Sequence, residues 1–78
     1  MDGVLAYVLI SLGAVDEQEI LQKLKEMEEV REAHVLFGEW DLIAKVEVGS
    51  SEELGEFMIE KIRKLPHVRL TSTLIAAK

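Results

Sequence analysis

The sequence contains no cysteine and only one proline, Pro66. Without cysteine the chain has neither disulfides nor thiolate metal ligands to stabilise it, and its composition fits a reducing compartment. A chain of 78 residues buries only about 60–65% of the surface that its unfolded form exposes, so its own core gives a small margin of stability. We therefore expect association with further subunits to supply the rest.

Long apolar runs and positive charge are also scarce. No apolar run approaches the roughly 18–20 residues that span a bilayer, and the N-terminus from Met1 to Gly3 lacks the basic stretch of a signal peptide. Fifteen acidic side chains against nine basic ones give a formal net charge of −6, which repels phosphate backbones. We expect a cytoplasmic protein with no membrane partner and no direct contact to nucleic acid. The absence of asparagine and the abundance of Glu and Lys favour a heat-adapted source.

The hydrophobic pattern predicts four strands and two helices in the order βαββαβ. The expected strands cover Val4–Ile10, Val30–Phe37, Asp41–Val48 and Val68–Ala76. The first helix is expected from the cap Asp16 to near Glu29, and the second from the cap Ser50 to Leu65, before Pro66. Their apolar stripes are Ile20, Leu21, Leu24 and Met27 in the first helix, and Leu54, Phe57, Met58, Ile62 and Leu65 in the second.

This order predicts a ferredoxin-like α+β fold, in which right-handed crossovers place both helices on one face of a four-stranded antiparallel sheet. The other face is then left bare. It would carry about half of Val4–Ile10 together with Leu36, Ile43 and Ile75, a larger apolar patch than soluble monomers usually expose. We expect a second copy of the chain to cover it, forming a homodimer through the sheet.

The sequence offers little for catalysis. The two histidines, His34 and His67, have a spacing that indicates neither a catalytic triad nor a metal site. The segment after the first strand, Ser11 to Ala14, has too few glycines and no lysine for a phosphate-binding loop. We therefore expect no catalytic residue, no metal and no cofactor.

The segment from Gly38 to Asp41 carries the most information about function. As an ordinary hairpin turn, it would give Gly38 a positive φ, hydrogen-bond Asp41 to nearby backbone and place Trp40 in a seam between subunits. As a ligand site, it would let backbone N–H groups at Gly38 approach an anionic group while the Asp41 carboxylate accepts an α-ammonium. Both interpretations are open at this point.

The last strand contains the run Thr71-Ser72-Thr73. Threonine favours β structure for reasons of packing alone, so the run needs no functional explanation. Thr71 and Thr73 nevertheless share one face of the strand, and their hydroxyls would suit a zwitterion held between subunits.

Four features of the sequence occur together: the apolar first strand, the short capped helix, the G-x-x-D-L pattern of Gly38 to Leu42 and the closing V-x-x-T-x-T pattern of Val68 to Thr73. In this combination the chain resembles the effector (RAM) domain of the Lrp/AsnC transcription regulators. The resemblance covers essentially the whole chain. It implies dimers formed sheet against sheet, gathered into octamers or decamers, with an amino-acid effector between dimers. The positions that it implies as effector contacts are Gly38, Glu39, Trp40, Asp41, Thr71 and Thr73.

Two departures from that family affect the interpretation. The pair Glu39-Trp40 differs from the smaller or Tyr-containing turn that is more usual, which leaves the identity of the effector open. The chain also starts directly before its first strand, without room for the helix-turn-helix domain that most members carry. The resemblance thus implies a single stand-alone effector domain over residues 1–78, which would modulate full-length Lrp/AsnC-type regulators by mixed assembly.

Three other functions remain open on the sequence. A dimeric α+β-barrel enzyme of the small monooxygenase type would use a similar fold, and only His34 is placed to serve it. An ACT-like regulatory module would also bind amino acids, but would pair its sheets edge to edge. A structural subunit without any ligand is the third.

Overall fold

The computed structural model describes residues 3–77, so residues 1, 2 and 78 of the expected domain lie outside the described part. The elements are β1 (Val4–Leu12), α1 (Glu17–Lys25), β2 (Val30–Val35), β3 (Leu42–Val48), α2 (Ser51–Phe57), η1 (Met58–Ile62) and β4 (Val68–Ile75). The short π-helix η1 continues α2. The predicted βαββαβ order is therefore confirmed, and with it the ferredoxin-like α+β fold.

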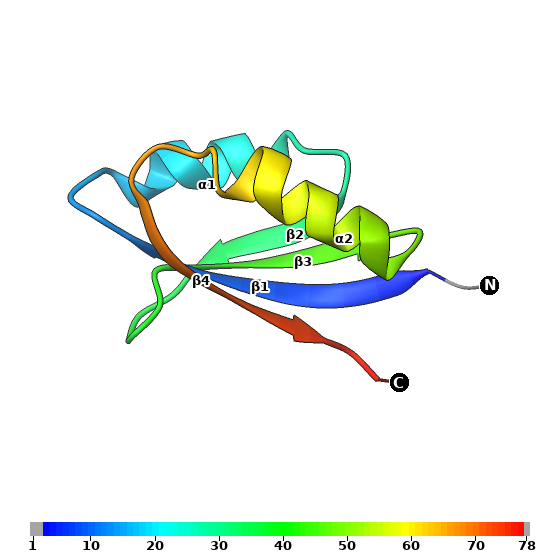
Figure 1. Ribbon diagram of the computed structural model, residues 1–78. Coiled ribbons are helices and arrows are strands. Elements are labelled where there is room, and N and C mark those ends of the chain that lie inside the picture. Colours follow the sequence, from blue (N-terminus) through cyan, green and yellow to red (C-terminus); the bar gives the residue numbers. More distant parts are fainter. Residues whose placement is uncertain (1–2, 78) are drawn as a thin grey trace.

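The four strands form one antiparallel sheet in the order β2-β3-β1-β4. The apolar strand β1 is central, paired with β3 on one side and β4 on the other, as its continuous hydrophobic run indicates. Both helices lie on the same side of this sheet (Figure 1). Within the described chain no element covers the opposite face, so the bare face that the topology predicts is present.

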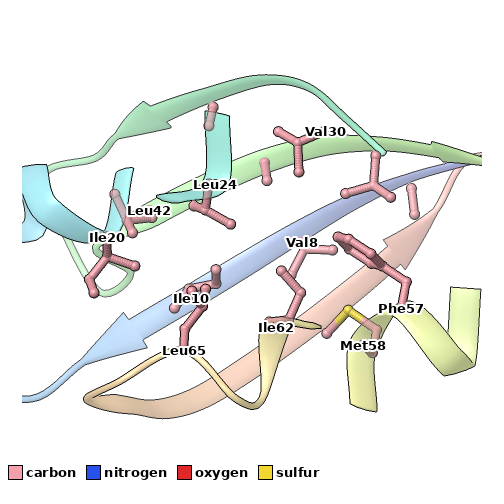
Figure 2. Packing of buried hydrophobic residues seen from close by; sticks show 14 of the residues in the cluster. Val8, Ile10, Ile20, Leu24, Val30, Leu42, Phe57, Met58, Ile62 and Leu65 are labelled. Carbon is pink, nitrogen blue, oxygen red and sulfur yellow. The ribbon is translucent and has the colours of Figure 1, made fainter. Parts of the chain in front are cut away.

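The core lies between the helices and one face of the sheet (Figure 2). Alternate residues of β1 and β3 point into it and are fully buried or nearly so, because successive side chains of a strand point to opposite faces. The predicted apolar stripe of the second helix is buried along its whole length. The strand residues are Ala6, Val8, Ile10, Leu42, Ala44 and Val46; the stripe residues are Leu54, Phe57, Met58 and Ile62 in α2 and η1, and Leu65, which follows the helical segment instead of ending it as predicted.

The first helix is shorter than predicted, since α1 ends at Lys25 and not near Glu29. Three glutamates in the following segment, among them Glu29, place negative charge at the end of the helix where the macrodipole favours cations. At the start of the helix Asp16 is the cap, as predicted, because its carboxylate accepts from the backbone N–H of Gln18 at 3.0 Å. The second cap is as predicted, because Ser50 Oγ accepts from the backbone N–H of Glu53 at 3.1 Å.

Two predictions about the faces of strands are wrong. Phe37 was expected on the core side of the second strand, but β2 ends at Val35 and the Phe37 side chain is fully exposed, at 104%. Ile75 was expected on the bare face, but it stands opposite the buried Ala6, and directly opposed residues of antiparallel strands point to the same face. Ile75 therefore lies on the helix side of β4. Both faces of this edge strand carry apolar and hydroxyl side chains, so only the register with β1 decides between them.

Candidate functional site

The connection between β2 and β3, from Leu36 to Asp41, is held in place by three backbone groups. The N–H of Leu36 donates to the carbonyl of Asp41 at 2.8 Å, and the N–H of Asp41 donates to the carbonyl of Ile10 at 2.9 Å. Gly38 has a φ of +135°, as the sequence predicts, and an added Cβ there would meet no atom within 4 Å. The backbone conformation, and not a lack of space, therefore requires glycine at this position.

The Asp41 carboxylate has a structural partner. Its Oδ2 accepts a hydrogen bond of 2.7 Å from the backbone N–H of Leu12, at the end of β1. The interpretation that Asp41 binds backbone is thus confirmed, although the partner belongs to a strand distant in sequence. A ligand ammonium would be met by the other carboxylate oxygen, Oδ1.

The remaining residues of the turn are accessible. Glu39 is exposed and Trp40 is half-buried, while Phe37 projects fully into solvent just before them. An aromatic side chain exposed on a well-fixed turn is typical of a contact with another molecule. The sequence analysis missed Phe37, because the alternation of the second strand seemed to continue through it.

Thr71 and Thr73 do share a face of β4, as predicted. They stand opposite the buried Ile10 and Val8, so both lie on the helix side of the sheet; Thr71 is half-buried and Thr73 exposed. Ile10 also pairs with Leu42 of β3, the residue after Asp41. The turn and Thr71 are thus brought to the same end of the sheet on either side of β1, two strand spacings or roughly 10 Å apart. Thr73 lies two residues further from that end.

A hollow among the described residues lies at the opposite end of the sheet. It has a volume of about 870 Å³, and no predicted site residue lines it. Its two cations are already paired, since Lys61 Nζ and Arg31 Nε lie 2.9 Å from carboxylate oxygens of Glu29 and Glu47. Because the acidic rim repels a carboxylate, this hollow does not suit an amino acid. Its glutamates are Glu28, Glu29, Glu47, Glu53, Glu56 and Glu60.

A smaller hollow of about 430 Å³ does include a predicted residue. It is lined by Arg63, Val68, Arg69, Leu70 and Thr71, at the end of the sheet where the turn also lies. Two arginines and no acidic residue line it, so this hollow favours anions, whereas the acidic rim of the larger one repels them. Neither arginine was among the residues predicted from the sequence.

The bare face is apolar over β4, β1 and part of β3, and charged over β2. Leu74 stands opposite Tyr7 and Ser72 opposite Leu9, and Leu70 and Leu74 are 64% and 54% exposed. Together with Ile43, whose predicted position on this face is confirmed by its pairing with Leu9, they form one patch. We call it the sheet patch; its residues are Leu5, Tyr7, Leu9, Ile43, Leu70 and Leu74.

His34 lies beside this patch, on the bare face as predicted. Its Nε2 is 2.9 Å from Glu32 Oε1, and Lys45 Nζ is 3.8 Å from the other oxygen of Glu32. The hydrogen bond with His34, and to a lesser extent the positive charge of Lys45, lower the pKa of Glu32. His34 is exposed and lines neither of the two hollows described above.

Comparison with known proteins shows to which family the chain belongs. Residues 5–78 match the family model described as the Lrp/AsnC ligand binding domain. The chain belongs to this family.

The relatives of this Lrp/AsnC domain are named as regulators. An HTH-type transcriptional regulator of Pyrococcus furiosus is 32% identical in an alignment 77 residues long, which covers 95% of this chain and 51% of that protein. A solved structure of a hypothetical protein from Pyrococcus horikoshii is 47% identical with a TM-score of 0.89, over 96% of this chain and 90% of that one. The structure of Escherichia coli AsnC is 32% identical with the same TM-score, 0.89, over 96% of this chain and 51% of AsnC.

The Lrp/AsnC domain spans about half the length of the curated relatives that it matches. Their names favour a regulatory role over an enzymatic one, and the Pyrococcus sources agree with the heat-adapted composition. Among residues 3–77 no helix is long and apolar enough to cross a membrane. The same residues include no group of three or more His, Asp or Glu side chains that could hold a metal ion.

Proposed function

We propose that this Lrp/AsnC domain is a self-assembling regulatory module that binds an amino acid between its subunits and thereby modulates transcription regulators of its family. One observation carries the proposal. The Gly38–Asp41 turn, fixed to the end of β1 at Ile10 and Leu12, presents accessible polar and aromatic groups at the same end of the sheet as Thr71, and it lines neither of the hollows described above.

In this proposal the turn and β4 form one half of the site. Backbone N–H groups near Gly38 donate hydrogen bonds to the effector carboxylate, and Asp41 Oδ1 accepts a hydrogen bond from the effector ammonium. The hydroxyls of Thr71 and Thr73 and the side chains of Glu39 and Trp40 complete this half. The neighbouring subunit supplies the other half and excludes water, which strengthens each polar contact.

The sheet patch supports the self-assembly. Its six large side chains lie on a face that no described element of the chain covers, and a contiguous apolar patch on a soluble domain marks a contact surface. A second copy related by a two-fold axis would bury the same patch on both subunits. Dimers formed in this way would gather into the octamer or decamer that the family resemblance implies, and would mix with full-length regulators through the same surface.

Thermal unfolding and light scattering with each common amino acid in turn test this proposal. We expect an assembly of several chains, and at least one amino acid that raises the unfolding temperature, because a ligand at about 100 times its Kd adds about 2.7 kcal/mol. A panel without any stabilising amino acid would refute the sensing role. A single-chain mass at every concentration would refute the assembly.

A further inference from the structure

The hollow beside Thr71 is bordered by two arginines without a carboxylate partner in residues 3–77, although the chain has a net charge of −6. Arg31, Lys45 and Lys61 each form an ion pair, whereas Arg63 and Arg69 do not. A cation at the end of a helix balances the macrodipole, which accounts for Arg63 only in part. It does not account for Arg69, which belongs to the strand β4.

Arg69 lies at an irregularity of β4. Leu70 stands opposite Ser11 on the bare face, whereas Val68 and not Arg69 stands opposite Leu12, so Arg69 is the extra residue of a bulge. Its stem lies near Gly13, where an added Cβ would be 3.7 Å from Arg69 Cδ, an ordinary van der Waals contact. Gly13 is itself fixed by a hydrogen bond of 2.8 Å from its N–H to the carbonyl of His67.

Arg63 is oriented by the π-helical turn. Its N–H donates to the carbonyl of Met58 at 2.9 Å, five residues back instead of four. The additional residue turns Arg63 by about 100° relative to its position in a regular α-helix. Such single π turns occur often at functional sites. Arg63, which follows η1, and Arg69 of β4 both line one hollow together with Thr71.

We propose that Arg63, Arg69 and the Thr71 hydroxyl form a subsite for a second carboxylate of the effector, so that the effector is an acidic amino acid. This inference rests on the proposed amino-acid site and names its ligand class. Guanidinium groups bind carboxylates in a bidentate fork, and a hydroxyl supplies a further donor.

Matched ligands test the subsite. Isothermal titration with L-glutamate, L-aspartate, L-glutamine and L-asparagine compares each acid with an amide of almost the same shape. Of L-glutamate and L-aspartate, we expect the one with the higher affinity to bind at least about tenfold more tightly than its own amide. The reason is that a charge-assisted hydrogen bond is roughly twice as strong as a neutral one. Equal affinities for acid and amide would overturn the subsite and leave the proposed function in place.

Matched variants separate the subsite from general electrostatic attraction. Arg63→Gln and Arg69→Gln, which keep hydrogen-bond donors, should each reduce the preference for acid over amide towards one. Lys64→Gln removes a neighbouring cation that does not line the hollow and should change that preference less than about twofold. An equal loss in all three variants would overturn the subsite, since net charge alone would then explain the preference.

Glutarate, a dicarboxylate without an ammonium group, distinguishes the two possible failures. If no amino acid binds but glutarate binds and loses affinity in Arg69→Gln, the proposed amino-acid site fails and the carboxylate subsite stands. If neither glutarate nor any acidic amino acid binds, the subsite is refuted. Circular dichroism of each variant confirms that the fold is retained.

Discussion

At the scale of single residues, Asp41 has a structural role in addition to the ligand contact that we propose for it. Its backbone N–H and carbonyl close the β2–β3 connection, and its Oδ2 accepts from the N–H of Leu12 at the end of β1. The carboxylate therefore fixes the turn on which the proposed effector contacts lie. A substitution that removes the carboxylate would disturb the turn as well as the charge.

Asp41→Ala and Asp41→Asn separate these two roles. Alanine leaves the part-buried N–H of Leu12 unpaired, so we expect the free energy of unfolding to fall by about 1–3 kcal/mol. Asparagine keeps an Oδ acceptor and should cost less than half as much, while losing the attraction for an α-ammonium. Urea denaturation measures the stabilities, and thermal shift with the effector measures binding. Equal stability of Asp41→Ala and the unchanged chain would show that the bond to Leu12 is dispensable.

At the scale of elements, α2 and η1 are stabilised by more than their apolar stripe. Lys61 of η1 donates to both carboxylate oxygens of Glu29 at 2.9 Å, which connects the second helix to the segment between α1 and β2. This hydrogen bond lowers the pKa of Glu29, and burial opposes the effect without cancelling it. Both side chains keep some exposure, 45% for Lys61 and 25% for Glu29, so solvent screens the pair.

Lys61→Met tests this connection through its dependence on pH. We expect a loss of about 0.2–1 kcal/mol at neutral pH, since the methionine keeps an apolar stem but not the charge. A lowered pKa in the folded chain means that the stabilisation is complete above the ordinary carboxyl pKa and is lost as the pH falls through the lowered value. Urea denaturation of both proteins should therefore converge at acidic pH.

Lys25→Met is the matched control for that comparison. Lys25 is exposed and forms no ion pair with another described residue, so its effect on stability should not follow the titration of Glu29. A difference between Lys61→Met and the unchanged chain that stays constant from neutral to acidic pH would contradict the role of Glu29.

At the scale of the whole molecule, the sheet patch decides whether the domain works alone or as an assembly. Leu9 lies near its centre, between Ile43 of β3 and Ser72 of β4. It is half-buried in the single chain. A long polar side chain at this position can therefore reach solvent in a folded monomer, but would lie buried and unpaired in a sheet-to-sheet dimer.

Leu9→Lys should dissociate the proposed dimer. The substitution removes the burial of a leucine side chain, which is worth about 1.5–3 kcal/mol when the side chain is fully buried. It also places two unpaired charges opposite each other in the dimer. We therefore expect the dimer Kd to rise by at least about 100-fold. Light scattering checks the mass, and circular dichroism checks that the monomer is folded. Gln22→Lys, on the exposed side of α1, should leave the mass unchanged. If Leu9→Lys kept its assembled mass, contact through the sheet edges would be the better model.

The sequence by itself determined the order of elements, the fold class and most of the core. A local pattern of apolar residues specifies the buried side chains in three places. These are the alternating apolar residues of β3, the continuous apolar run of β1 and the apolar stripe from Leu54 to Leu65. Local capping chemistry also specified the start of α2 at Ser50. Periodicity within one segment is sufficient for these features, because each depends only on neighbouring residues.

Only the tertiary structure decided the faces of β4, the end of β2 before Phe37, and the arrangement around the candidate site. The register of β4 against β1 places Thr71 and Ile75 on the helix side. The path of the chain from η1 into β4 brings Arg63 and Arg69 to the lining of one hollow. These features depend on pairing between residues far apart in the chain, and no local period encodes such pairing.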